Sequence, residues 1–224
     1  MMERLLHFFA QYPIDLISHL SSILSIIAGA LRYKYLTPNL KAIWVLFILN
    51  FIKDTYSLII IFTEPSNAYI YNIEPIYQTI LIGVIFYLSF DGSANRRLIG
   101  ALTGICTLIT LFYYQKDQVS TVSLSVFKLF AIVLSLSYFN KVVMDMRVKN
   151  IMGHSMFWFT AGLLVYAAGT FFTVLFSEFI FNPKIVDDET FSIYWNLNSF
   201  LFILFAVLSA ISIWFGKFDR ENLI

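Results

Sequence analysis

Seven long apolar segments, separated by short polar connections, constrain the fold of this chain more than any other feature. They lie near residues 14–34, 41–63, 69–90, 97–115, 119–141, 154–181 and 189–215. The hydrocarbon core of a bilayer is about 30 Å thick, so a helix needs roughly 20 apolar residues to cross it. The sequence therefore predicts an all-α, polytopic membrane protein, with residues 1–224 forming one domain of seven transmembrane helices.

The composition excludes several classes of protein. Hydrophobic residues make up 59% of the chain and charged residues only 13%, which is outside the range of soluble domains. The net charge of +1 and the lack of a basic stripe with interleaved aromatic residues predict no nucleic-acid partner. One cysteine, Cys106, and three scattered histidines offer no metal-ligand spacing, so we expect no metal and no cofactor.

The basic residues predict how the helices are oriented in the membrane. Alternate connections carry ten Lys or Arg residues on one side and three on the other, Arg4, Lys116 and Lys184. The positive-inside rule then places the N-terminus outside and the C-terminus in the cytoplasm of a multi-pass protein in the cell inner membrane. The ten are Arg32, Lys34, Lys41, Arg96, Arg97, Lys141, Arg147, Lys149, Lys217 and Arg220.

Two segments of similar sequence suggest an internal repeat. "IYNIEPIYQTILIGVIFY" opens the third predicted span, and "IYWNLNSFLFILFAVLSA" opens the seventh. Both spans enter from the same side, which fits two parallel three-helix units joined by the fourth helix, a 3+1+3 arrangement. Chance similarity between aromatic-rich helices is the alternative.

Two adjacent charges, Lys53 and Asp54, lie within the apolar run "FILNFIKDTYSLIIIF". A charge near the bilayer centre costs about 2.5–3.5 kcal/mol and normally faces a partner or a water-filled cavity. Neighbouring residues on a helix point about 100° apart, so we expect the two side chains to find partners on different helices. Asp54 lies nine residues before the predicted end of its span and Lys128 nine residues after the start of the fifth, so these two are expected to meet. Lys53 with Glu74 is the second expected pair.

Further polar residues fall at similar predicted depths, whereas the cytoplasmic halves of the spans are plainer. This asymmetry predicts a polar pocket that opens outward and binds a small ligand or lipid. The alternative is that the same residues only join helices, with about 0.6 kcal/mol for each hydrogen bond. The predicted ligand-binding residues are Lys53, Asp54, Glu74, Tyr77, Gln78, Lys128, Tyr194, Asn196 and Asn198.

Three short motifs are more typical of packing than of chemistry. "SVFK", which ends at Lys128, matches the S-x-x-K spacing of a serine nucleophile, but no companion motif follows it. "GALTG", residues 100–104, is a G-x-x-x-G that predicts close helix packing, within the chain or between copies. Gly162 and Gly169 give the sixth span one face of small residues.

Three segments carry a resemblance to known proteins: "NIEPIYQTILIGVIFY", "FWFTAGLLVYAAGTFF" and "YWNLNSFLFILFAV". They resemble segments of a loosely defined group of small bacterial seven-helix inner-membrane proteins, often encoded near sensor histidine kinases. The resemblance implies a signalling accessory and transfers no site residues. The seven-helix arrangement is also similar to lysoplasmalogenase-like membrane hydrolases, without a residue-by-residue match to their motif.

These observations leave three functional hypotheses. The first is a membrane sensor or signalling accessory, which needs a cytoplasmic or membrane partner to pass its signal on. The second is a small-solute transporter of 3+1+3 helices. The third is an intramembrane lipid hydrolase with Asp54 or Glu74 as general base. Membrane lipid is an expected partner of each, and a homo-oligomer is compatible with all three.

Overall fold

The computed structural model describes residues 13–60, 67–145, 151–180 and 186–219. These residues form helices with no strand among them, which confirms the predicted all-α fold. Seven helices have 20 residues or more: α2 (Pro13–Arg32), α3 (Pro38–Ile60), α4 (Ala68–Ser89), α5 (Ser93–Phe112), α6 (Thr121–Asp145), α7 (Ser155–Leu175) and α9 (Asp188–Phe215). The shorter elements are the 3-10 helices η1 (Tyr33–Tyr35) and η2 (Ile151–Gly153) and the single turn α8 (Ser177–Ile180).

Five of the described helices, α2, α3, α6, α7 and α9, are long and apolar enough to cross a membrane. The chain is therefore a polytopic membrane protein. Helices α4 and α5 match the remaining two predicted segments in position, and polar residues interrupt the apolar sequence of both. Asn72, Glu74 and Gln78 interrupt the apolar sequence of α4, and Arg96 and Arg97 lie near the start of α5. The exact number of spans stays a prediction.

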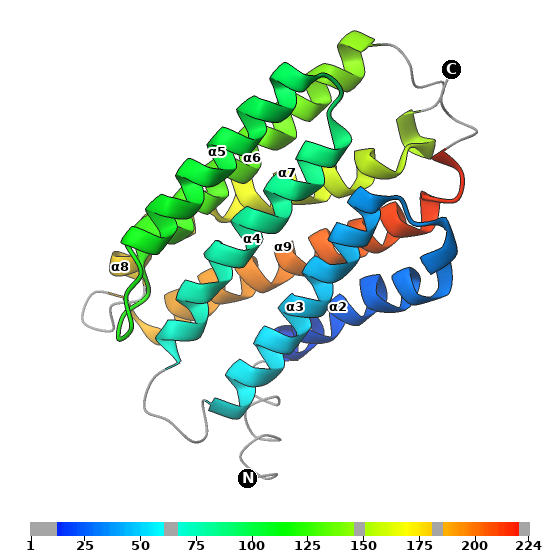
Figure 1. Ribbon diagram of the computed structural model, residues 1–224. Helices are drawn as coiled ribbons and strands as arrows, with labels where there is room; N and C mark the ends of the chain where they lie inside the picture. The colour runs from blue at the N-terminus through cyan, green and yellow to red at the C-terminus, as the bar shows by residue number, and fades with distance from the viewer. Residues whose placement is uncertain (1–12, 61–66, 146–150, 181–185, 220–224) are drawn as a thin grey trace.

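The helices pack as a closed ring in chain order, with α5 outside it. Helix α2 packs on α3, α3 on α4, α4 on α6, α6 on α7, α7 on α9, and α9 returns to α2. Helix α5 packs against α4 and α6, and α3 also touches α9 across the ring. Figure 1 shows the helices running side by side, from the lower left of the view to the upper right.

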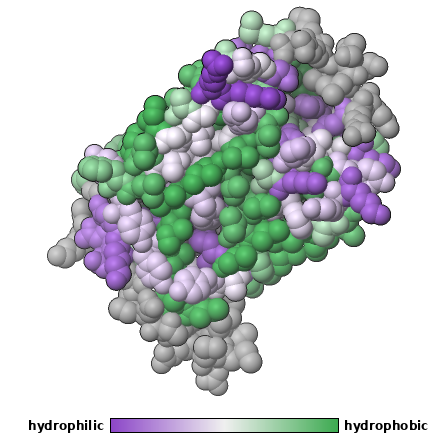
Figure 2. Space-filling view, in the orientation of Figure 1, coloured by the Kyte–Doolittle hydropathy of each residue, from purple (hydrophilic) through white to green (hydrophobic). Residues whose placement is uncertain are grey.

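The two ends of the bundle differ in charge. We call them the Asp15 end and the Arg32 end, after residues near the two ends of α2. In the described residues, the basic side chains of the connections lie at the Arg32 end, except Lys116. Figure 2 shows hydrophobic residues across the middle of the visible face and hydrophilic residues mainly toward its two ends. Which end faces the cytoplasm stays a prediction, and Arg4, Arg147, Lys149, Lys184 and Arg220 lie outside the described residues.

Aromatic rings fill the interior. Phe47, Phe86 and Phe159 are fully buried. Phe47 and Phe159 both contact Phe205, with ring centroids 5.2 and 5.7 Å apart, and Tyr166 stacks on the same Phe205 ring at 5.5 Å. Lipid tails are as apolar as these rings, so helix association in a membrane depends on close packing rather than on burial from water.

Glycines show where helices come closest. A Cβ at Gly162 would lie 3.0 Å from Leu208 and one at Gly169 2.7 Å from Leu201, so the small-residue face predicted on this helix packs against α9. A Cβ at Gly100 or Gly104 would meet no atom of another described element within 4 Å, so this face of α5 points away from the ring. The expectation that this G-x-x-x-G packs within the chain is wrong. Contact between copies through it stays a prediction.

A pair of glycine substitutions tests this packing. We expect Gly29→Ala to lower stability by about 1–3 kcal/mol, because its Cβ would lie 2.0 Å from the Trp44 ring. Gly104→Ala gains the same methyl group in open space and is the matched control, neutral or slightly stabilising. Thermal unfolding in detergent measures both. Equal melting temperatures for the two variants would contradict the described contact between α2 and α3.

Candidate functional site

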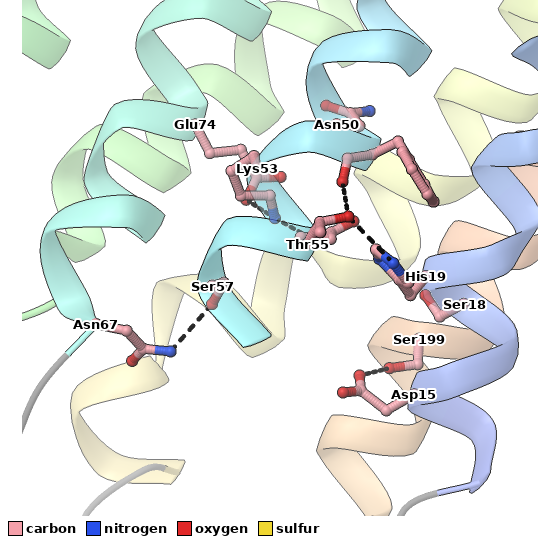
Figure 3. Close-up of polar contacts among 12 residues, drawn as sticks. Asp15, Ser18, His19, Asn50, Lys53, Thr55, Ser57, Asn67, Glu74 and Ser199 are labelled. Carbon is pink, nitrogen blue, oxygen red and sulfur yellow. Dashed lines mark hydrogen bonds and ion pairs between the residues drawn. The ribbon is translucent and has the colours of Figure 1, made fainter. Parts of the chain in front are cut away.

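Three charged side chains meet between α3 and α4 toward the Asp15 end of the bundle. The Lys53 Nζ lies 2.5 Å from the Asp54 Oδ1 and 2.9 Å from the Glu74 Oε2. The side chains are 13%, 26% and 14% exposed, respectively, so Asp54 is the most open of the three. One ammonium group is therefore shared by two carboxylates inside the helical bundle. Figure 3 shows Lys53 of α3 beside Glu74 of α4.

This geometry confirms one predicted pair and overturns another. Lys53 pairs with Glu74 as expected. The expectation that Lys53 and Asp54 seek partners on different helices is wrong, as is the predicted pairing of Asp54 with Lys128. The physical reason is the four-carbon stem of lysine, which lets the ammonium of Lys53 reach past the direction of its Cα–Cβ bond to the neighbouring carboxylate.

Hydrogen bonds extend the ion pairs deeper into the bundle. The Gln78 Nε2 donates to the Glu74 Oε1 at 2.9 Å and to the Asn50 Oδ1 at 3.1 Å. The Tyr77 hydroxyl donates to the same Asn50 oxygen at 2.7 Å. We call this connected set the polar cluster; it consists of Asn50, Lys53, Asp54, Glu74, Tyr77 and Gln78.

Helical spacing brings these residues together. On α4, Glu74, Tyr77 and Gln78 are three and four residues apart, so their side chains lie on one face. On α3, Asn50 and Lys53 share the face that meets α4 in the same way. Sequence reasoning found every member of the polar cluster except Asn50, although its position three residues before Lys53 was a usable signal.

A second polar group joins α2 to α9 and α3. The Asp15 carboxylate accepts hydrogen bonds from the Trp195 Nε1 at 3.2 Å and from the Ser199 hydroxyl at 3.3 Å. The His19 Nε2 lies 3.4 Å from the Thr55 hydroxyl (Figure 3). None of these residues is among the ligand-binding residues predicted from the sequence. The four-residue spacing of Trp195 and Ser199 on α9 was the available signal.

The structure does not join three predicted residues of α9 to either group. Tyr194, Asn196 and Asn198 are half-buried, and none makes a hydrogen bond with a described residue. The face of α9 that meets α2 carries Trp195 and Ser199 instead. The role of Tyr194, Asn196 and Asn198 in ligand binding stays a prediction.

Lys128 is buried without a carboxylate beside it. It is 3% exposed, and its Nζ lies 3.4 Å from the centroid of the Tyr166 ring. In the described part of the chain it forms no ion pair or hydrogen bond. The Ser125 hydroxyl is likewise buried without a hydrogen-bond partner there, so the S-x-x-K spacing does not produce a serine–lysine contact. A cation over an aromatic face is the only strong interaction that the described residues give Lys128.

One negative charge of the polar cluster has no cation of its own. Asp54 and Glu74 share Lys53, and Lys128 forms no ion pair with either carboxylate in the described part of the chain. With a rise of about 1.5 Å per residue, Glu74 lies about 9 Å and Lys128 about 10 Å from the Asp15 ends of their helices. The four charges therefore occupy one level of the bundle.

Two buried nitrogen atoms beside this region lack partners among the described residues. They are the Nδ2 of Asn50, which is 1% exposed, and the Nδ1 of His19. An unsatisfied buried donor costs about 1–3 kcal/mol. The Asn50 amide is correctly oriented by its own contacts, since its Oδ1 accepts two hydrogen bonds. Its N–H groups are available to an acceptor that the described part of the chain does not supply.

A comparison of the chain with models of protein families, with curated proteins and with solved structures finds no match. Among the described residues, no group of three His, Cys, Asp or Glu side chains is arranged to hold a metal ion. Function must therefore be inferred from the polar cluster and its surroundings.

The two buried lysines differ in their partners, which gives a direct test of the site. We expect Lys53→Met to lower stability by about 3–5 kcal/mol, because it leaves two carboxylates without their shared cation. Lys128→Met removes a cation that has no carboxylate partner, so we expect a change of about 1 kcal/mol or less. Thermal or denaturant unfolding in lipid nanodiscs measures the difference. A larger loss for Lys128→Met would contradict the described ion pairs.

Proposed function

We propose that this protein is an integral membrane sensor or signalling accessory of the cell inner membrane, which binds a small ligand in the polar cluster from the Asp15 end. The observation that supports this most is the buried amide of Asn50, whose N–H groups have no acceptor among the described residues although its oxygen accepts two hydrogen bonds. Groups that only join helices would be expected to satisfy one another, as Gln78 and Glu74 do.

The polar cluster favours a particular ligand chemistry. Asp54 and Glu74 share one ammonium, so a second cationic group could be accommodated by the excess negative charge. The Asn50 amide offers donors to an acceptor on the same ligand. The ring of Tyr71, whose centroid lies 5.5 Å from the Lys53 Nζ, adds an aromatic face for a cation. These features together fit a small molecule that carries an amine and a hydrogen-bond acceptor.

Helix α4 is the element that would transmit binding. It contacts α3, α5 and α6, and Glu74 ties it to Lys53 of α3. Pro75 follows Glu74 within the helix and cannot donate the backbone hydrogen bond that a helix normally makes there. A ligand that competes for Glu74 would therefore loosen α4 from α3 at a point where the helix is already weakened. The basic connections at the Arg32 end offer a surface to a signalling partner.

A small-solute transporter is the second candidate, and the order of the ring favours it. The contacts of α2 with α3, α3 with α4 and α4 with α6 correspond to those of α6 with α7, α7 with α9 and α9 with α2. A two-fold axis through the ring would relate the two sets, with α5 as the extra helix. Two parallel three-helix units would produce this pattern.

A ligand screen separates these possibilities. We expect a small amine that carries a hydrogen-bond acceptor to raise the melting temperature of the wild-type protein in nanodiscs. Ligand at 100 times its Kd stabilises the folded state by about 2.7 kcal/mol. We expect Asp54→Asn to lose this stabilisation and Lys116→Met, in the α5–α6 connection, to keep it.

The transporter and the sensor differ in a second measurement. Uptake of the same amine into liposomes that contain the protein would favour transport, and binding without uptake would favour sensing. Equal stabilisation of wild type and Asp54→Asn by every amine that binds would contradict a ligand site in the polar cluster.

A further inference from the structure

A groove runs between α2 and α9 on the outside of the ring, toward the Arg32 end. Its volume is about 350 Å³. Side chains of Leu24, Ile27 and Leu31 line one wall, and those of Ala210, Ile211 and Trp214 line the other. Leu24, Ile27 and Leu31 are between 49% and 69% exposed in the isolated chain, so this surface is open to whatever surrounds the helices.

Arg32 lies at the end of this groove. Its guanidinium carbon lies 4.0 Å from the ring centroid of Trp214, a residue of the groove wall, and this stacking holds the side chain beside the groove. The Arg32 Nε is buried and has no hydrogen-bond partner among the described residues. A planar guanidinium with free donors binds a phosphate group through two parallel hydrogen bonds.

The surroundings of Arg32 add positive rather than negative charge. Lys34 is exposed two residues further along the chain. Lys217, also exposed, reaches the same region, because its Nζ lies 5.7 Å from the centroid of the Tyr35 ring. The carboxylate of Asp219 is engaged elsewhere: it accepts hydrogen bonds from the backbone N–H and the hydroxyl of Ser155 at the start of α7.

We propose that this groove is a binding site for one anionic phospholipid, with an acyl chain between α2 and α9 and the phosphate on the Arg32 guanidinium. The groove is apolar where lipid tails lie and cationic at its membrane-surface end, which matches the two parts of such a lipid. A partner helix would fill the apolar walls but would leave the Arg32 donors unsatisfied. The site is separate from the polar cluster, which lies toward the other end of the bundle.

The test compares two lipids of the same chains on delipidated protein in detergent. Phosphatidylglycerol should bind about five-fold more tightly than phosphatidylcholine, the factor that corresponds to about one basic side chain at an anionic surface. Native mass spectrometry and the rise in melting temperature with lipid concentration both measure this ratio. Inorganic phosphate at the same concentrations should produce no shift, because it lacks the chain that fills the groove.

Two variants locate the site, and a third variant is the control. The Arg32→Gln variant should bind phosphatidylglycerol and phosphatidylcholine about equally tightly. Ala210→Phe, which fills the groove and leaves Arg32 in place, should reduce binding of both lipids. Arg97→Gln removes an exposed charge at the same end of the bundle, on α5, and should keep the five-fold preference.

Two outcomes would overturn the proposal. One is equal binding of the two lipids to the wild-type protein. The other is a loss of preference in Arg97→Gln as large as that in Arg32→Gln, which would mean that the lipid responds to the general charge of this surface. If Arg32→Gln does not fold, the same lipid titration of Ala210→Phe decides, since unchanged binding there would exclude the groove.

Discussion

The ammonium of Lys53, shared by the carboxylates of Asp54 and Glu74, is the interaction on which this account of the protein depends. In an apolar surrounding, burying any one of these charged groups alone costs free energy, and the opposite charge beside it offsets that cost. Because Glu74 also accepts from Gln78, and Gln78 donates to Asn50, the ion pairs determine how α3 and α4 meet. Both the geometry of this contact and the chemistry of the proposed ligand site follow from the same few atoms.

The remainder of the bundle supports this region by close packing. Rings of Phe47, Phe159 and Phe205 fill the interior of the ring, and glycines on α2, α4 and α7 let neighbouring helices approach. Helix α5 stands apart, with only Ile99 and Thr110 buried along its length. The polar residues thus lie in a closely packed frame, and α4, with Pro75 in its first half, lacks one backbone hydrogen bond of a regular helix.

The sequence predicted the fold well because the rule that governs it is general. Apolar segments of about 20 residues must be helical in lipid, so the positions of the helices could be predicted without knowing any contact. The pairing of Lys53 with Glu74 was also predictable, since both residues lie at similar depth on consecutive helices. Residues that lie far apart in the chain were harder: Asp15 meets Ser199 only because the ring closes α9 against α2, and no local pattern encodes that closure. The contact of Lys53 with Asp54 was missed because the direction of a Cα–Cβ bond does not fix where a long flexible side chain ends.

We propose that these charges are retained for a ligand rather than for stability. This claim is tested most directly by the free energy of unfolding of the triple variant Lys53→Met, Asp54→Asn and Glu74→Gln in lipid nanodiscs. Replacing a buried ion network by neutral groups of similar size is often neutral or stabilising by about 1–4 kcal/mol, so we predict that the triple variant is at least as stable as the wild type. A triple variant that is less stable than the wild type by several kcal/mol would show that the charges hold the helices together, and would contradict the claim.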